Sequence, residues 1–166
     1  MVHPYPPHDD KLPYVGKYHY FLTFRTEDGT PFFVDADKAT LVCTQLLRAA
    51  KEQQFALTTY CLMPDHAHVI ASGLSHTSRL KTFVARAKQY SAFYFKREYG
   101  CTLWQRYGFE RLIRDDMELA LTIGYIVANP VRAALVGHPS EYPHLGSSRF
   151  TVAELLEMCD YERILE

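Results

Sequence analysis

The segment 63–70, Met-Pro-Asp-His-Ala-His-Val-Ile, places two imidazoles two residues apart in an otherwise apolar run. Successive side chains of an extended strand alternate between its faces, so His66 and His68 point the same way while Ala67 and Val69 turn into the core. Two imidazoles on one face can hold one divalent cation. They supply only part of the coordination of a Mg²⁺ or Mn²⁺ ion that also grips a phosphate oxygen, so we expect a further oxygen ligand elsewhere in the chain.

A phenol and an amide that could meet the same phosphate occur later in the chain. Tyr125 and Asn129 are four residues apart in a predicted helix, and therefore lie on one face a single turn apart. A tyrosine nucleophile forms a phosphotyrosyl intermediate, while the metal stabilises charge on the phosphate and orients it for in-line attack. The spacing alone leaves the nucleophile open, because the chain has twelve tyrosines and Tyr90 and Tyr94 fit nearly as well.

The net charge of the chain is −1, but its basic residues gather in one stretch. Residues 79–114 hold nine basic and two acidic side chains, a local charge of +7, and nine aromatic rings stand among them. Such cations can meet phosphates and such rings can stack on unpaired bases; the alternative interpretation is a solvated basic helix with its rings in the core. The candidate DNA contacts are Arg79, Lys81, Arg86, Lys88, Lys96, Arg97, Trp104 and Arg106.

Length and composition predict one globular domain over residues 1–166, with a core at about 17–150 and a C-terminal helix at about 151–166. The chain has no apolar stretch long enough to span a bilayer, and Met1 to Asp10 lacks the basic and apolar regions of a signal peptide. We therefore expect a soluble, cytoplasmic protein with no membrane partner. The four cysteines form no C-x-x-C pair, which favours reduced thiols over a zinc knuckle or a disulfide scaffold.

The elements that must position these residues follow from periodicity and turn signals. Strands are predicted at 18–25, 55–62, 66–72 and near 105–113, and helices at 38–54, 75–99, from Asp115-Asp116 towards Ala128, and at 152–165. Asp37 is the predicted cap of the first helix, Pro64-Asp65 a tight turn between two strands, and Asn129-Pro130 the end or bend of the third helix. This order predicts an α+β fold in which helices pack on a small antiparallel sheet.

The motifs together resemble a known family. Segment 63–70 is similar to the histidine-hydrophobic-histidine (HUH) motif of single-tyrosine transposases. Segments 103–107 (Leu-Trp-Gln-Arg-Tyr), 125–136 (Tyr-Ile-Val-Ala-Asn-Pro-Val-Arg-Ala-Ala-Leu-Val) and 141–143 (Glu-Tyr-Pro) with Ser147-Ser148 resemble the REP-associated tyrosine transposases in order and spacing. The resemblance covers roughly residues 18–150. Two positions depart from it: a tryptophan is usual after Pro143, and an asparagine is common near Lys96.

This resemblance implies a ferredoxin-like HUH endonuclease core. It implies Tyr125 as the nucleophile, with His66, His68 and Asn129 as ligands of Mg²⁺ or Mn²⁺. The implied substrate is single-stranded, often hairpin-forming DNA, which is cleaved to a 5′-phosphotyrosine and a free 3′-hydroxyl and then rejoined. A homodimer, the action of the tyrosine in cis or in trans, the recognised sequence and whether the protein is still mobile stay open.

Two other functions are compatible with the sequence. A domesticated relative would bind structured single strands without cutting them. A two-histidine phosphodiesterase would use a pair of His-x-Ser/Thr motifs, and the chain contains 76–78 (His-Thr-Ser) and 138–140 (His-Pro-Ser). Both of these segments have polar or turn-like surroundings, which disfavours a buried symmetrical pair.

Overall fold

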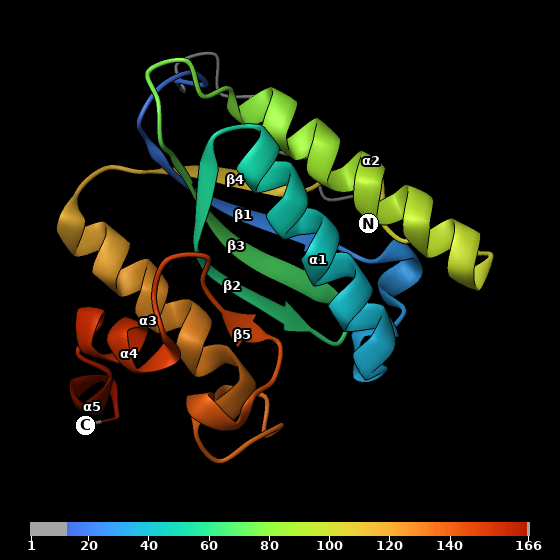
Figure 1. Ribbon diagram of the computed structural model, residues 1–166. Helices are drawn as coiled ribbons and strands as arrows, with labels where there is room; N and C mark the ends of the chain where they lie inside the picture. The colour runs from blue at the N-terminus through green and yellow to red at the C-terminus, as the bar shows by residue number, and fades with distance from the viewer. Residues whose placement is uncertain (1–12, 166) are drawn as a thin grey trace, which may run out of the picture.

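Five antiparallel strands form one sheet in the order β4-β1-β3-β2-β5 (Figure 1). The computed structural model describes residues 13–165, so the expectation about Met1 to Asp10 lies outside the described residues. The strands are β1 (His19–Arg25), β2 (Phe55–Met63), β3 (His66–Gly73), β4 (Phe109–Ile113) and β5 (Leu145–Gly146). The predicted α+β class, an antiparallel sheet with helices packed on it, is confirmed.

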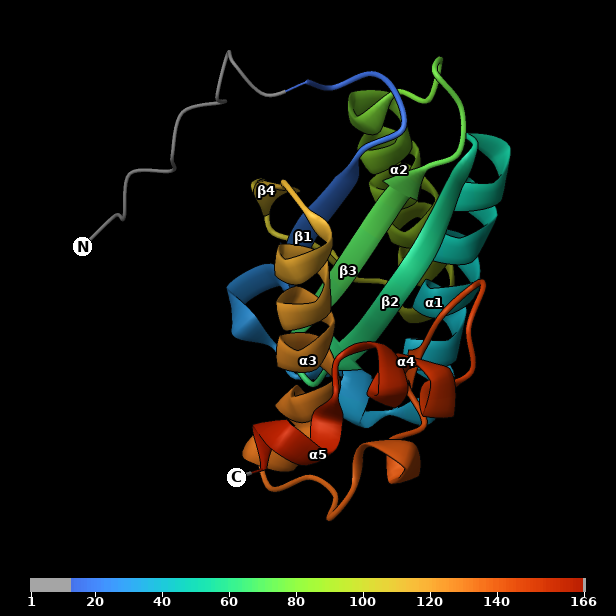
Figure 2. The same cartoon turned by 90° about the vertical axis from the view of Figure 1, so that its left-hand side faces the viewer.

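Helices cover both faces of this sheet, as Figure 2 shows. The helices α1 (Ala36–Glu52) and α2 (Leu80–Tyr99) lie side by side on one face. The opposite face carries α3 (Asp116–Arg132), α4 (Val152–Met158) and α5 (Tyr161–Ile164). Short 3₁₀ helices lie at Glu27–Gly29, Phe32–Val34 and Pro139–Glu141. None of the helices among residues 13–165 is long and apolar enough to cross a membrane.

Alternation along the strands divides the interior into two cores. Leu22 on β1 and Val69 on β3 belong to the core under α1 and α2, whereas Phe21 and Ile70 belong to the core under α3. Each step of one residue changes the face of the sheet, so His66 and His68 share the α3 face with Ile70. The strand thus directs both imidazoles to the side on which α3 lies.

The elements differ from their predicted bounds where local polar contacts or turns intervene. The helix α2 begins at Leu80 and not at residue 75, because the Ser78 hydroxyl donates to the Gln54 carbonyl and accepts from the Ser75 amide, which holds a turn there. The predicted tail helix is two helices, separated at Asp160, whose φ of 51° is left-handed. The third helix runs through Pro130 and ends at Arg132.

The β2–β3 hairpin is the predicted tight turn, and contacts from elsewhere hold it in place. Met63 pairs with His66 across the hairpin end. The Asp65 carbonyl accepts from both the amide and the hydroxyl of Thr26, and the Pro64 carbonyl accepts from the amide of Phe33. The turn that precedes His66 is therefore anchored to the segment after β1.

The N-terminus of α1 gives a prediction for stability. The Asp35 side chain accepts from the amides of Asp37 and Lys38, so Asp35 is the cap, and the prediction that Asp37 caps this helix is wrong. We expect Asp35→Ala to lower the free energy of unfolding by about 1 kcal/mol in urea titrations, since two amides lose their acceptor. The matched change Asp37→Ala removes only a favourable charge in the first turn and should cost about 0.3 kcal/mol. Equal losses from the two variants would contradict this assignment of the cap.

Candidate active site

His66 and His68 face one another at the end of β3 near the hairpin. Their Nε2 atoms are 3.1 Å apart and their ring centroids 4.6 Å apart. Both side chains come from the same face of the strand, as the sequence pattern predicts, and the turn anchored through Asp65 fixes where the strand begins.

The other ring nitrogen of each histidine has its own partner. His66 Nδ1 lies 2.7 Å from the Asp65 carboxylate, and His68 Nδ1 lies 3.0 Å from the hydroxyl of Thr23, which is its register partner on β1. A carboxylate accepts a hydrogen bond from Nδ1–H, so a neutral His66 presents an unprotonated Nε2. The Asp65 carboxylate thus fixes both the tautomer and the orientation of His66, whereas the Thr23 hydroxyl, which can donate or accept, holds only the orientation of His68.

His68 is held in its neutral form. Its side chain is buried, with 6% of its surface exposed. Burial, with smaller contributions from the charges of His66, Arg25 and Arg132, lowers the pKa of His68 to about 3. Metal ligation requires a neutral imidazole. Because His68 is neutral near pH 7, protonation does not compete with metal binding at its ring.

Tyr125 on α3 lies beside this pair in the same chain. Its ring centroid is 5.6 Å from that of His68 and 6.1 Å from that of Phe21, and the Phe21 ring is 5.4 Å from His68. The Arg132 guanidinium lies 4.5 Å from the centre of the Tyr125 ring. Tyr125 is 45% exposed, so the phenol is open to a substrate. The rival tyrosines, Tyr90 and Tyr94, lie on α2 and therefore on the opposite side of the sheet.

Asn129 follows Tyr125 by one turn of α3. Its amide nitrogen is buried and has no hydrogen-bond partner among the described residues, a state that usually costs about 1–3 kcal/mol. A rotation of the Asn129 side-chain amide exchanges the positions of its nitrogen and oxygen. The oxygen, which is the atom that can bind a metal, would then occupy the position of the unpartnered nitrogen. An unpartnered amide of this kind is compatible with a ligand role.

The donor set fits a divalent cation. Two nitrogens bound to one ion at about 2.1 Å and at right angles are about 3.0 Å apart, close to the separation of the two Nε2 atoms. Among residues 13–165 no cluster of three or more His, Cys, Asp and Glu side chains could hold a metal. An amide, water or phosphate oxygen can supply a further ligand at such a site.

The candidate DNA contacts do not gather at this site. Arg79, at the N-terminus of α2, and the α2 side chains lie on the opposite side of the sheet from Tyr125. The exposed members of the set are Arg79, Lys81, Arg86, Lys96, Arg97 and Arg106. Lys88 is half-buried against Phe24, and burial lowers its pKa.

Trp104 does not reach the surface. Its ring packs against Phe24 and Phe33, its indole nitrogen donates to the Ser91 hydroxyl at 2.8 Å, and only 7% of the residue is exposed. In this structure the ring joins α2 to the first core, and its contact with DNA stays a prediction.

Sequence reasoning missed three neighbours of the histidines and the tyrosine: Phe21, Thr23 and Arg132. The alternation of β1 places Phe21 and Thr23 on one face, but which face and which histidine they meet depends on the pairing register with β3. The segments of the rival phosphodiesterase stay apart from the strands, since His76 lies in the loop before α2 and His138 precedes the 3₁₀ helix after α3.

Comparisons with known proteins identify the class of protein to which this α+β chain belongs. A family model described as "Transposase IS200 like" matches residues 14–126. The match covers more than half of the chain, so the chain belongs to the IS200-like transposase family.

Individual proteins extend the match. A protein of Haemophilus influenzae named as a REP-associated tyrosine transposase is 28% identical over 149 residues, which cover 82% of this chain and 83% of the relative. A solved REP-associated tyrosine transposase bound to a REP hairpin superposes with a TM-score of 0.69 at 18% identity, covering 81% of this chain and 79% of that one. A structure from Deinococcus radiodurans, named as a transposase, gives a TM-score of 0.53 at 20% identity, with coverage of 66% and 89%. The two solved structures establish the shared fold.

Proposed function

We propose that this transposase-family chain cleaves and rejoins single-stranded DNA through a covalent bond to Tyr125. The observation that carries the proposal is the juxtaposition of Tyr125 with His66 and His68 within one chain, on one face of the sheet. The nucleophile and the half-site for a cation come from elements far apart in sequence, and Tyr125 is 45% exposed, so a substrate can reach it.

The chemistry exchanges one phosphoester for another. The Tyr125 oxygen attacks a backbone phosphorus, the bond from phosphorus to the 3′ oxygen breaks, and the proton lost by the phenol is balanced by the one gained by the 3′ hydroxyl. Attack of a 3′ hydroxyl on the phosphotyrosine reverses the step and joins strands. A Mg²⁺ or Mn²⁺ ion held by His66, His68 and Asn129 would stabilise charge on the phosphate oxygens. Asp65 and Thr23 keep the two imidazoles oriented for that role.

Hairpin or single-stranded DNA is the proposed partner. The solved relative that shares this fold is bound to a REP hairpin. The exposed cations of α2 carry the phosphate contacts in this proposal, and Arg106 lies in the loop that leads from α2 to the edge strand β4. Because α2 and Tyr125 lie on opposite faces, DNA that touches both must pass round an edge or an end of the sheet, and the position of Arg106 before β4 favours the β4 edge.

The deciding experiment is a denaturing gel. The protein is incubated with Mn²⁺ and a labelled hairpin oligonucleotide, and we expect a labelled species that migrates with the protein. Cleavage without this adduct would support a phosphodiesterase, and binding without cleavage would support a DNA-binding relative. A mass measurement in solution tests the homodimer, which stays a prediction.

A further inference from the structure

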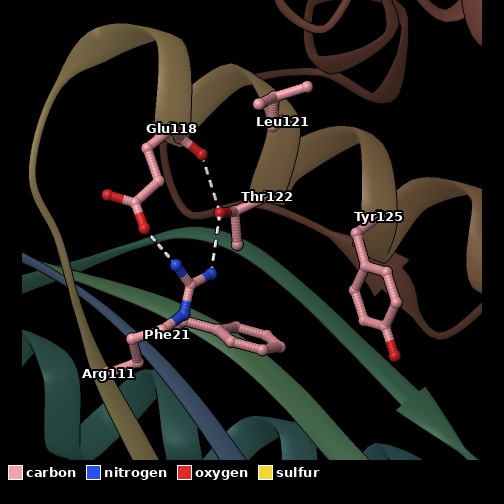
Figure 3. A pocket seen from close by; sticks show the side chains of 6 residues that line it. All are labelled: Phe21, Arg111, Glu118, Leu121, Thr122 and Tyr125. Atoms are coloured by element: carbon pink, nitrogen blue, oxygen red, sulfur yellow. Dashed lines mark hydrogen bonds and ion pairs between the residues drawn. The ribbon is translucent and has the colours of Figure 1, made fainter.

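A cavity of about 450 Å³ opens beside the proposed nucleophile, between α3 and the strands β1 and β4. Figure 3 shows the Phe21 ring between the Arg111 guanidinium and Tyr125, with Leu121 on the helix above. Its volume is that of a small-molecule site. The side chains that line it are Phe21, Arg111, Glu118, Leu121, Thr122 and Tyr125.

The lining is apolar except at one end. Leu121 is 67% exposed and Phe109, whose ring is 6.2 Å from Phe21, is 41% exposed, so large apolar side chains face solvent around the opening. The Arg111 guanidinium lies 5.7 Å from the centre of the Phe21 ring. Aromatic and aliphatic surface with one guanidinium suits a flat, polar-edged ligand.

The charge at the polar end is already balanced. Arg111 pairs with the Glu118 carboxylate and donates to the Thr122 hydroxyl, and the second Glu118 oxygen accepts from the Arg114 amide. A phosphate would meet this carboxylate and be repelled, whereas a neutral base edge can accept from the remaining guanidinium protons. The pocket therefore suits a nucleobase better than a phosphate.

We propose that this pocket binds one unpaired nucleobase of the DNA strand whose phosphate is attacked by Tyr125. This inference rests on the proposed function and adds to it a binding site for one base of the substrate. Tyr125 belongs to both the pocket and the proposed reaction site, so a strand placed on the phenol carries a base within one nucleotide of the cavity. Packing against Leu121, and against the 8% of Phe21 that stays exposed at the pocket wall, then holds the backbone in position for attack.

A tryptophan placed at the rim reports on this binding. Leu121 and Met117 are one helical turn apart on α3 and are 67% and 75% exposed, but only Leu121 lines the pocket. Leu121→Trp and its matched control Met117→Trp are made on a Tyr125→Phe background, which prevents cleavage. The chain's own tryptophan, Trp104, is buried and gives a constant background.

The probes are two hairpin oligonucleotides with the same stem. One carries a randomised single-stranded 5′ extension, and in the other the extension is abasic, so that phosphates remain without bases. We expect quenching of Leu121→Trp by the first probe only and no change in Met117→Trp. We also expect the base-bearing probe to bind about tenfold more tightly, a preference that Leu121→Ser loses and Met117→Ser keeps.

The outcomes separate this subsite from the function on which it rests. Equal quenching by the abasic probe, or an equal response at position 117, overturns the pocket even when wild-type protein forms the covalent adduct. Base-dependent quenching without any adduct in wild-type protein keeps the pocket and overturns the cleavage chemistry. Failure of both probes to bind at low salt overturns both proposals.

Discussion

Tyr125→Phe is expected to abolish the covalent protein–DNA adduct, with a loss of about 10³-fold or more in the rate of its formation. Phenylalanine keeps the ring that lies beside His68 and Phe21 and beneath the Arg132 guanidinium, and removes only the attacking oxygen. The residue is 45% exposed, so the free energy of unfolding should change by no more than about 0.5 kcal/mol. The denaturing gel measures the adduct, and a binding assay on the same samples should show unchanged affinity for the hairpin.

The control variants come from the two rival tyrosines. Tyr90 and Tyr94 lie on α2, and Tyr90 donates to the Glu52 carboxylate at 2.7 Å. We expect Tyr90→Phe and Tyr94→Phe to form the adduct at the wild-type rate. If either variant loses it while Tyr125→Phe keeps it, the nucleophile lies on the opposite face of the sheet and the proposed site is wrong.

Those features of the site that depend on nearby residues could be predicted from the sequence. The shared face of His66 and His68 follows from strand alternation, and the hairpin before them follows from Pro64-Asp65. The single turn between Tyr125 and Asn129 follows from helical periodicity. Each of these inferences requires only that a short segment be recognised as a strand, a turn or a helix, and the motifs are sufficient for that.

The rest depends on how the elements pack, which spacing does not determine. Thr23 meets His68 only because β1 pairs with β3 in one particular register, and that register is specified by the whole hydrophobic pattern of the sheet. The basic stretch supplies the candidate DNA contacts, but α2 packs on the face away from Tyr125, and Trp104 is buried in the core beneath it. Charge and aromatic content indicate a helix that could bind DNA, and they do not indicate which face of the sheet it covers.

The second large effect is expected on metal binding. We expect His66→Ala and His68→Ala each to weaken Mn²⁺ binding about 100-fold or more, since each removes one of the two nitrogens, 3.1 Å apart, that are proposed to bind one ion. Asn129→Ala should weaken it about tenfold, because water can replace an amide oxygen. Titration of Mn²⁺ followed by electron paramagnetic resonance measures free and bound ion without DNA and without any catalytic step.

His19→Ala is the matched control for this titration. His19 lies on β1 and shares the α3 face with Phe21 and Thr23 by alternation, but its Nδ1 is 2.6 Å from the Ser72 hydroxyl, and Ser72 pairs with His19 in the sheet register. Burial lowers the pKa of His19 as it does that of His68, so both imidazoles are neutral near pH 7. His68 faces a second imidazole, that of His66, whereas His19 faces the Ser72 hydroxyl. Mn²⁺ binding should therefore survive His19→Ala unchanged. Equal losses from His19→Ala and His68→Ala would mean that Mn²⁺ binding depends on the fold of the sheet and not on the facing pair, and the tyrosine would then have to act without the cation assigned to it.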